Sequence, residues 1–226
     1  MHITSGSSIF QEQLSHFKKP VVQYIVIFIL LISAFSVRLY HINRPPLDFT
    51  PTRQFQSAHI ARGIYFNSNE MISESRRQIA NLNMERIGLL LEPRIIENLA
   101  VLGYRIAGSE ILWLPRVLSS IFWTIGGFFL FLIARRISSV GSAFFAVMFY
   151  LFLPYSISAS RSFQPDSMMV MMMLASIYTV LWYFEKPSIL RILISAVVSS
   201  VAILIKPYCL FPIWTVFVFM SIHHKG

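Results

Sequence analysis

The chain contains only one cysteine, Cys209, and few charged residues. A single cysteine supports neither an internal disulfide framework nor a thiolate metal cluster. Only 13% of the 226 residues are charged, whereas 55% are hydrophobic, and the mean hydropathy is +0.62. These values leave no room for a conventional soluble domain and are typical of a polytopic membrane protein.

The sequence also lacks a cleavable signal peptide and any recognisable nucleic-acid-binding motif. The N-terminus is polar up to Lys18 and Lys19, and the apolar run that follows is long enough to remain as a membrane span. The net charge is +9, but the basic residues are spread along loops and span ends. The charge therefore favours membrane lipid or an anionic lipid-linked substrate as partner, and it argues against nucleic acid.

What the sequence does contain is a series of hydrophobic runs of about 20 residues, the length that crosses a bilayer. Short basic segments between alternate runs place both termini in the cytoplasm by the positive-inside rule. We predict an all-α integral membrane protein with one membrane domain, about six transmembrane helices and a long outer loop of amphipathic juxtamembrane helices. The predicted segments are a cytoplasmic tail at 1–19, an outer loop at 41–110, and spans at 21–40, 111–133, 141–158, 167–184, 192–205 and 208–222.

The outer loop opens with Asp48, which lies just before a predicted helix. The two consecutive prolines ahead of it hold the backbone extended. Thr50 and Pro51 then form an N-cap and a first helical residue, which predicts a helix to about residue 66. Asp48 is therefore either a general base near an anion site, or a capping carboxylate that pairs with Arg53. Helical spacing turns Arg53 and Arg62 to different faces of the helix. The two arginines therefore cannot both bind one phosphate unless the helix is flanked on both sides.

Two further helices are predicted in the outer loop. A cap region at 67–70 begins a second helix that reaches residue 91, and its mixture of apolar and basic residues suits the headgroup layer. Pro93 ends this helix, and a third runs over 95–107 and stops at Gly108. Glu92, beside Pro93, is by its local sequence a solvated carboxylate at a helix end.

Three charged residues at the ends of later spans are also candidates for a site. Asp166 either caps the helix that follows it or forms a site-lining pair with Arg161 at the outer surface. Lys206 lies between two apolar runs, where a lysine either extends to the headgroups or binds an anion.

Several short motifs follow one another along the chain. They are Asp48, Thr52-Arg53 and Ile60-Ala61-Arg62 in the outer loop, Trp113-Leu-Pro115-Arg116 and Arg135-Arg136 at the ends of the second span, and the turn Arg161-Ser-Phe-Gln-Pro-Asp166. This order resembles the membrane glycosyltransferases that use polyprenyl-phosphate sugars, a GT-C group similar to family 39. The group includes the protein O-mannosyltransferases and the lipid A aminoarabinose transferase.

The resemblance implies an enzyme that moves a sugar from a polyprenyl-phosphate donor to an acceptor hydroxyl or amine, with inversion at the anomeric carbon. The acceptor is a lipid, a glycan or a protein. No cofactor is required, and a divalent metal is compatible with the sequence. The implied roles are Asp48 as general base, Arg53, Lys206 and Arg62 at the donor phosphate, Arg161, Asp166 and Glu92 lining the site, and Glu92 as the metal contact.

The resemblance also implies a location, the inner (plasma) membrane with the active site on the outer, periplasmic side. Family members usually continue with more spans, so residues 1–226 are expected to correspond to an N-terminal half. The alternatives are a non-enzymatic module, such as a lipid carrier or a transporter subunit, and an inactive truncated glycosyltransferase. Transporters place charges at mid-membrane and often contain inverted repeats. The clustering of charge at the outer surface, with no visible repeat, favours the enzyme.

Overall fold

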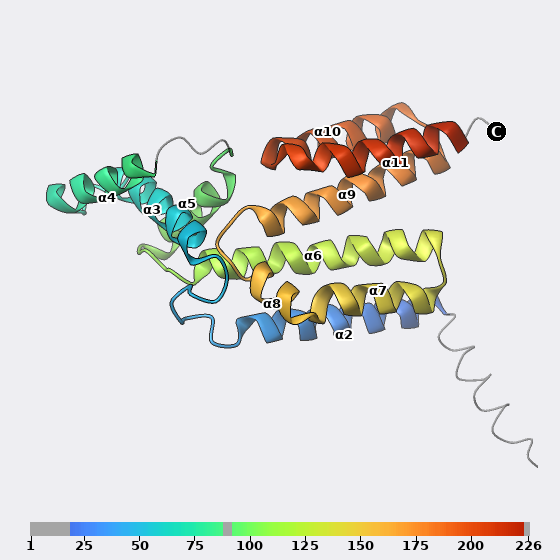
Figure 1. Cartoon of the computed structure of the whole chain (residues 1–226), viewed down its shortest axis with the longest axis horizontal. Coiled ribbons are helices and arrows are strands. Elements are labelled where there is room, and N and C mark those ends of the chain that lie inside the picture. The colour runs from blue at the N-terminus through green and yellow to red at the C-terminus, as the bar shows by residue number, and fades with distance from the viewer. Residues whose placement is uncertain (1–18, 88–91, 224–226) are drawn as a thin grey trace, which may run out of the picture.

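The computed structural model describes residues 19–87 and 92–223, and within these ranges the regular elements are helical. The long helices run alongside one another as a bundle, and α3, α4 and α5 lie beyond one end of it (Figure 1). The elements are α2 (Pro20–Leu39), α3 (Pro51–Asn67), α4 (Glu74–Arg86), α5 (Ile95–Ala107), α6 (Leu114–Ile137), α7 (Val140–Phe152), α8 (Pro154–Ser160), α9 (Asp166–Glu185), α10 (Ile189–Ile205), the 3₁₀ turn η1 (Pro207–Cys209) and α11 (Leu210–His223).

Within the bundle, α6 occupies the middle. It packs against α2 and α7 on one side and against α9 on the other, and α10 and α11 in turn cover α9 (Figure 1). The side chains that face outward from α2, α10 and α11 are largely apolar, as expected for helices in contact with lipid. Examples are Phe28, Leu193 and Phe211, which are all exposed.

The structure confirms the prediction of an all-α protein with apolar helices long enough to span a membrane. Within the described ranges, α2, α6 and α9 are long and apolar enough to cross a membrane, and α7 with α8 makes a fourth candidate if the bent pair is one span. The helices at 189–205 and 207–223 are apolar but shorter. At 1.5 Å per residue, 17 residues extend about 25 Å, whereas the hydrocarbon core is about 30 Å thick. Six spans therefore remain a prediction.

The helix ends follow local sequence signals. α3 begins at Pro51, and α5 ends at Ala107 because Gly108 adopts the left-handed conformation with φ 71°. The second loop helix differs from the prediction, since α4 begins at Glu74 after Ser73 and not near residue 67. The reason is that α3 continues to Asn67 and a turn follows, in which the Asn69 side chain accepts from the Met71 N–H. The predicted end of that helix, at residue 91, lies outside the described residues.

The third predicted span is broken where Pro154 occurs. Since proline lacks an N–H, it cannot donate to the carbonyl of Tyr150, and α7 and α8 meet at an angle of 61°. Indole Nε1 of Trp123 lies 3.4 Å from that carbonyl instead. The break at this proline directs α8 toward the loop end of the bundle (Figure 1).

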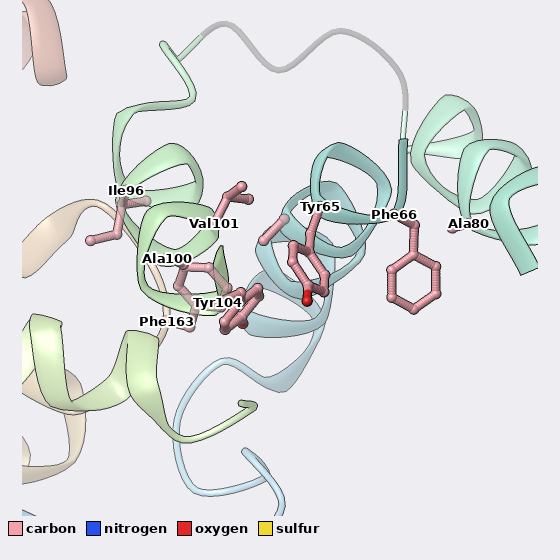
Figure 2. Packing of buried hydrophobic residues seen from close by; sticks show 9 residues of the cluster. Tyr65, Phe66, Ala80, Ile96, Ala100, Val101, Tyr104 and Phe163 are labelled. Carbon is pink, nitrogen blue, oxygen red and sulfur yellow. The ribbon is translucent and has the colours of Figure 1, made fainter. Parts of the chain in front are cut away.

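A hydrophobic cluster joins the outer helices to the bundle. Tyr65 of α3 and Tyr104 of α5 meet edge to face, with ring centroids 5.7 Å apart (Figure 2). Phe163, from the turn between α8 and α9, is buried in the same cluster. Burial of a phenylalanine is worth about 1.5–3 kcal/mol, so this contact holds the α8–α9 turn against the outer loop. The other buried members are Ala61, Phe66, Ala80, Ile96, Ala100 and Val101.

Basic residues gather at the opposite end of the bundle. Arg135 of α6 stacks over Tyr24 of α2, and Arg136 forms an ion pair of 3.1 Å with Glu185 at the end of α9. These contacts join the start of α2 to the ends of α6 and α9.

Candidate functional site

Asp48 lies in the link between α2 and α3 and is held by an arginine from the first turn of α6. Nη2 of Arg116 donates to Oδ2 of Asp48 at 2.8 Å. The Arg116 side chain is only 3% exposed, and Pro115 lies in the first turn of the helix that presents it, α6. Its Nε and Nη1 donate to three backbone carbonyls, those of Arg161, Ile42 and Arg44. One guanidinium therefore fixes both the link that carries Asp48 and the α8–α9 turn.

Arg161, at the end of α8, brings a second cation to the same carboxylate. Its Nε lies 3.6 Å from Oδ2 of Asp48, which is an ion-pair distance but too long for a hydrogen bond. This nitrogen is buried and has no hydrogen-bond partner among the described residues. The single hydrogen bond of Asp48 to the described part of the chain uses Oδ2. The second carboxylate oxygen, Oδ1, is therefore left to accept a proton or a hydrogen bond.

A second charged group lies where α3, α5, α9 and α10 come together. Nζ of Lys206 lies 2.9 Å from Oδ1 of Asp166 and 3.1 Å from Oε1 of Glu92. Nη2 of Arg53 donates to the other oxygen of Glu92 at 2.7 Å. Lys206 is 14% exposed, and its side chain is directed to these two carboxylates. Two cations and two carboxylates thus form one continuous network.

The pKa values of the central pair are shifted by this network. Burial disfavours the charged form of Glu92, but hydrogen bonds and positive charge from Arg53 and Lys206 outweigh it, and the pKa of Glu92 is lowered. Burial likewise opposes the charge on Lys206, and the carboxylates of Asp166 and Glu92 more than compensate, so its pKa is raised. Both groups are therefore held in their ionised forms.

Two glutamines join the start of α3 to the α8–α9 turn. Gln54 of α3 is completely buried, and its side chain accepts from the Phe163 N–H and donates to the Phe49 carbonyl. Thr50 donates to Oε1 of Gln164 at 3.2 Å, and Thr50 itself has a φ of 38°. A left-handed threonine is strained by about 1–3 kcal/mol, and such strain is concentrated at functional sites. These contacts bring the start of α3 against the α8–α9 turn.

The capping interpretation of Asp48 is not supported. Thr50 is the N-cap of α3, as predicted, but no side chain provides a capping hydrogen bond there. Arg53 pairs with Glu92 and also donates to Ser57, not to Asp48. Asp166 likewise makes no capping bond. The structure also separates the predicted Arg161–Asp166 pair, since each residue has a different partner.

Arg62 belongs to a different contact. Its Nε donates to both oxygens of Glu110, at 2.8 and 3.0 Å. The prediction that Arg53 and Arg62 face different directions is confirmed by these separate partners. Arg62 is therefore not part of the group formed by Arg53 and Lys206.

The surroundings of Glu92 do not fit a divalent cation. Its two nearest charged neighbours are cations, whereas a metal requires several anionic or neutral ligands. Over residues 19–87 and 92–223, no group of three or more histidine, cysteine, aspartate or glutamate side chains is placed to hold a metal ion.

The sequence interpretation assigned no role to Arg116, Gln54 or Gln164. Arg116 was part of a motif, and an arginine at the start of an apolar span is itself a signal, because such a charge needs partners. The glutamines gave no signal, since an isolated amide in a loop helix is usually solvated. Their role depends on two segments about 110 residues apart that meet only in the fold.

These observations define a helical membrane protein with a polar, cation-rich site at one end of the bundle. A family model described as dolichyl-phosphate-mannose-protein mannosyltransferase matches residues 92–226, which is more than half of the chain. The chain belongs to this family of GT-C glycosyltransferases. The matched segment includes Glu92, Arg116, Asp166 and Lys206, whereas Asp48 precedes it. No curated protein and no solved structure matches the chain.

Proposed function

We propose that this protein transfers a sugar from a polyprenyl-phosphate donor to an acceptor hydroxyl or amine at the outer face of the membrane. The family supports a glycosyltransferase. The observation that carries the more specific proposal is the placement of a partly exposed carboxylate, Asp48, at the same end of the bundle as the partly buried cations Arg53 and Lys206. The arrangement supplies a base for the acceptor and positive charge for a phosphate leaving group.

In the proposed transfer, one bond to the anomeric carbon forms as another breaks. Oδ1 of Asp48 accepts the proton of the acceptor while the acceptor oxygen or nitrogen attacks the anomeric carbon from the side opposite the phosphate. The bond between the anomeric carbon and the phosphate oxygen breaks, and its electron pair leaves with polyprenyl phosphate. Inversion follows from this single displacement. Arg116 and Arg161 hold Oδ2, which orients Oδ1.

The cations next to Glu92 are the proposed donor-phosphate site. Lys206 has three N–H donors, and the carboxylates of Glu92 and Asp166 use two of them, which leaves one for a phosphate oxygen. Negative charge grows on that phosphate as the bond breaks, so fixed cations there stabilise the transition state more than the ground state. Arg161 is a better third contact than Arg62, because Arg62 is occupied by Glu110.

The membrane arrangement is proposed with the function. All six apolar segments, including α10 and the η1–α11 helix, are assigned as spans, with the α3–α5 region outside and the Arg135–Arg136 end in the cytoplasm. This assignment places Asp48 and Lys206 at the outer surface. A bacterial location would make this the periplasmic face of the inner membrane.

Donor binding by the purified chain tests the phosphate assignment. Arg53→Gln and Lys206→Gln should each weaken binding of a labelled polyprenyl-phosphate sugar by about 1.5–3 kcal/mol, the usual value for a hydrogen bond to a charged group. That is about 10- to 150-fold in Kd. Lys206→Arg keeps the charge and should lose less than Lys206→Gln. Arg86→Gln, an exposed arginine of α4, is the matched control. Unchanged affinity in both Gln variants, with unchanged thermal unfolding, contradicts the assignment.

A further inference from the structure

Arg38, in the last turn of α2, is completely buried and has no acidic partner among the described residues. A buried guanidinium within an apolar span is costly unless its donors are satisfied. Arg38 satisfies them with neutral groups. Its three hydrogen bonds are Nε to Oγ of Ser160 at 2.7 Å, Nη1 to the Ala34 carbonyl at 2.8 Å, and Nη2 to the Leu151 carbonyl at 2.8 Å.

Two of these acceptors lie on opposite sides of the break at Pro154. Leu151 is in the last turn of α7, where backbone carbonyls have no N–H donor within the helix. The Leu151 carbonyl is therefore free to accept from Arg38. Ser160 is the last residue of α8. The planar guanidinium therefore joins both arms of the 61° bend and holds their relative direction.

Ser160, which Arg38 holds at the end of α8, is connected directly to both charged groups of the candidate site. Arg161, the next residue, contacts Asp48 and gives its carbonyl to Arg116. The carbonyl of Ser160 accepts from Ser167 in the first turn of α9, next to Asp166 and its partner Lys206. A shift of Ser160 would therefore move Arg161 and, through Ser167, the start of α9 that carries Asp166.

We propose that Arg38 is a positioning residue, which sets the α7–α8 bend and so places Arg161 against Asp48. This inference rests on the proposed function for its catalytic consequence, but the positioning itself does not. The fork shape of arginine is required, because a lysine offers one nitrogen and cannot reach three acceptors on three helices. Positive charge alone would not suffice.

The catalytic test is a double-mutant cycle on sugar transfer by the full chain. Arg38→Met should lower kcat on the order of 10²-fold, as for a misplacement of about 1 Å, with little change in donor KM. In an Arg161→Met background the further loss should be small, because the two residues act together. Arg38→Lys should remain impaired. Additive losses, or wild-type kcat in Arg38→Lys, would overturn the proposal.

A test that needs no activity is hydrogen exchange followed by mass spectrometry. Arg38→Met should speed amide exchange selectively over residues 159–165, where the Phe163 N–H is bonded to Gln54. The comparison is Ile213→Ala, which opens a cavity in α11 away from the bend. A uniform increase over the bundle in both variants, or no change at 159–165, contradicts positioning. Selective exchange without any transferase activity would retain the positioning and refute the proposed function.

Discussion

Arg116 and Asp48 are separated by 68 positions in the sequence, and their side chains meet at 2.8 Å. The arginine also donates to carbonyls on either side of the site, so it organises the backbone as well as the carboxylate. Asp48 lies in an irregular link, and its contact with Arg116 fixes that link to helix α6. That relationship makes a direct prediction for stability.

Arg116→Met should destabilise the protein on the order of 3 kcal/mol, because buried carbonyls lose their donor. Most of this cost comes from the three carbonyls, since Asp48 is 35% exposed and can be hydrated. Thermal or denaturant unfolding in detergent measures the effect. Arg105→Met, at an exposed position of α5, should change stability by no more than about 0.5 kcal/mol. Equal stability of the two variants would show that Arg116 does not hold the site together.

The sequence was sufficient to predict the helical class and the bounds of α3 and α5, because these depend on local signals such as Pro51 and Gly108. It also named most of the cations and carboxylates that the structure brings into the two charged groups, although Arg116 was assigned no role. Their pairing was less predictable. Arg53 was expected near Asp48 but reaches Glu92 across 39 positions, and Lys206 joins it from another helix. Such pairings depend on how distant helices pack, which helical periodicity does not encode.

The pH dependence of stability should follow from the shifted groups. The pKa of Glu92 is lowered from 4.5, so its stabilising contribution is complete above pH 4.5 and is lost as pH falls through the lower folded value. The pKa of Lys206 is raised from 10.5, so its contribution is complete below pH 10.5 and is lost as pH rises further. The difference in unfolding temperature between wild type and Glu92→Gln should be constant between these limits and shrink in acid. A difference that changes near neutral pH would contradict these ion pairs.

The proposed topology can be tested by labelling with a membrane-impermeant thiol reagent. Cys209 is buried and is replaced by serine first, and single cysteines are then placed at the exposed positions Ser68 and Ser188. Reagent added outside intact cells should label position 68, which lies beside α3, and not position 188, which lies between α9 and α10. Labelling of position 188 alone would reverse the orientation. Labelling of both would contradict the assignment of six spans.

The central claim is that Asp48 is the general base, and Asp48→Asn tests it most directly. Asparagine keeps the size of the side chain and can still accept from Arg116, so folding and donor binding should remain close to wild type. General base catalysis is typically worth about 10²–10⁴-fold, so kcat for sugar transfer should fall by that order. Asp166→Asn, at a residue assigned to shape the site, should lose less. Transfer by Asp48→Asn at near wild-type rate, with intact folding, would contradict the mechanism.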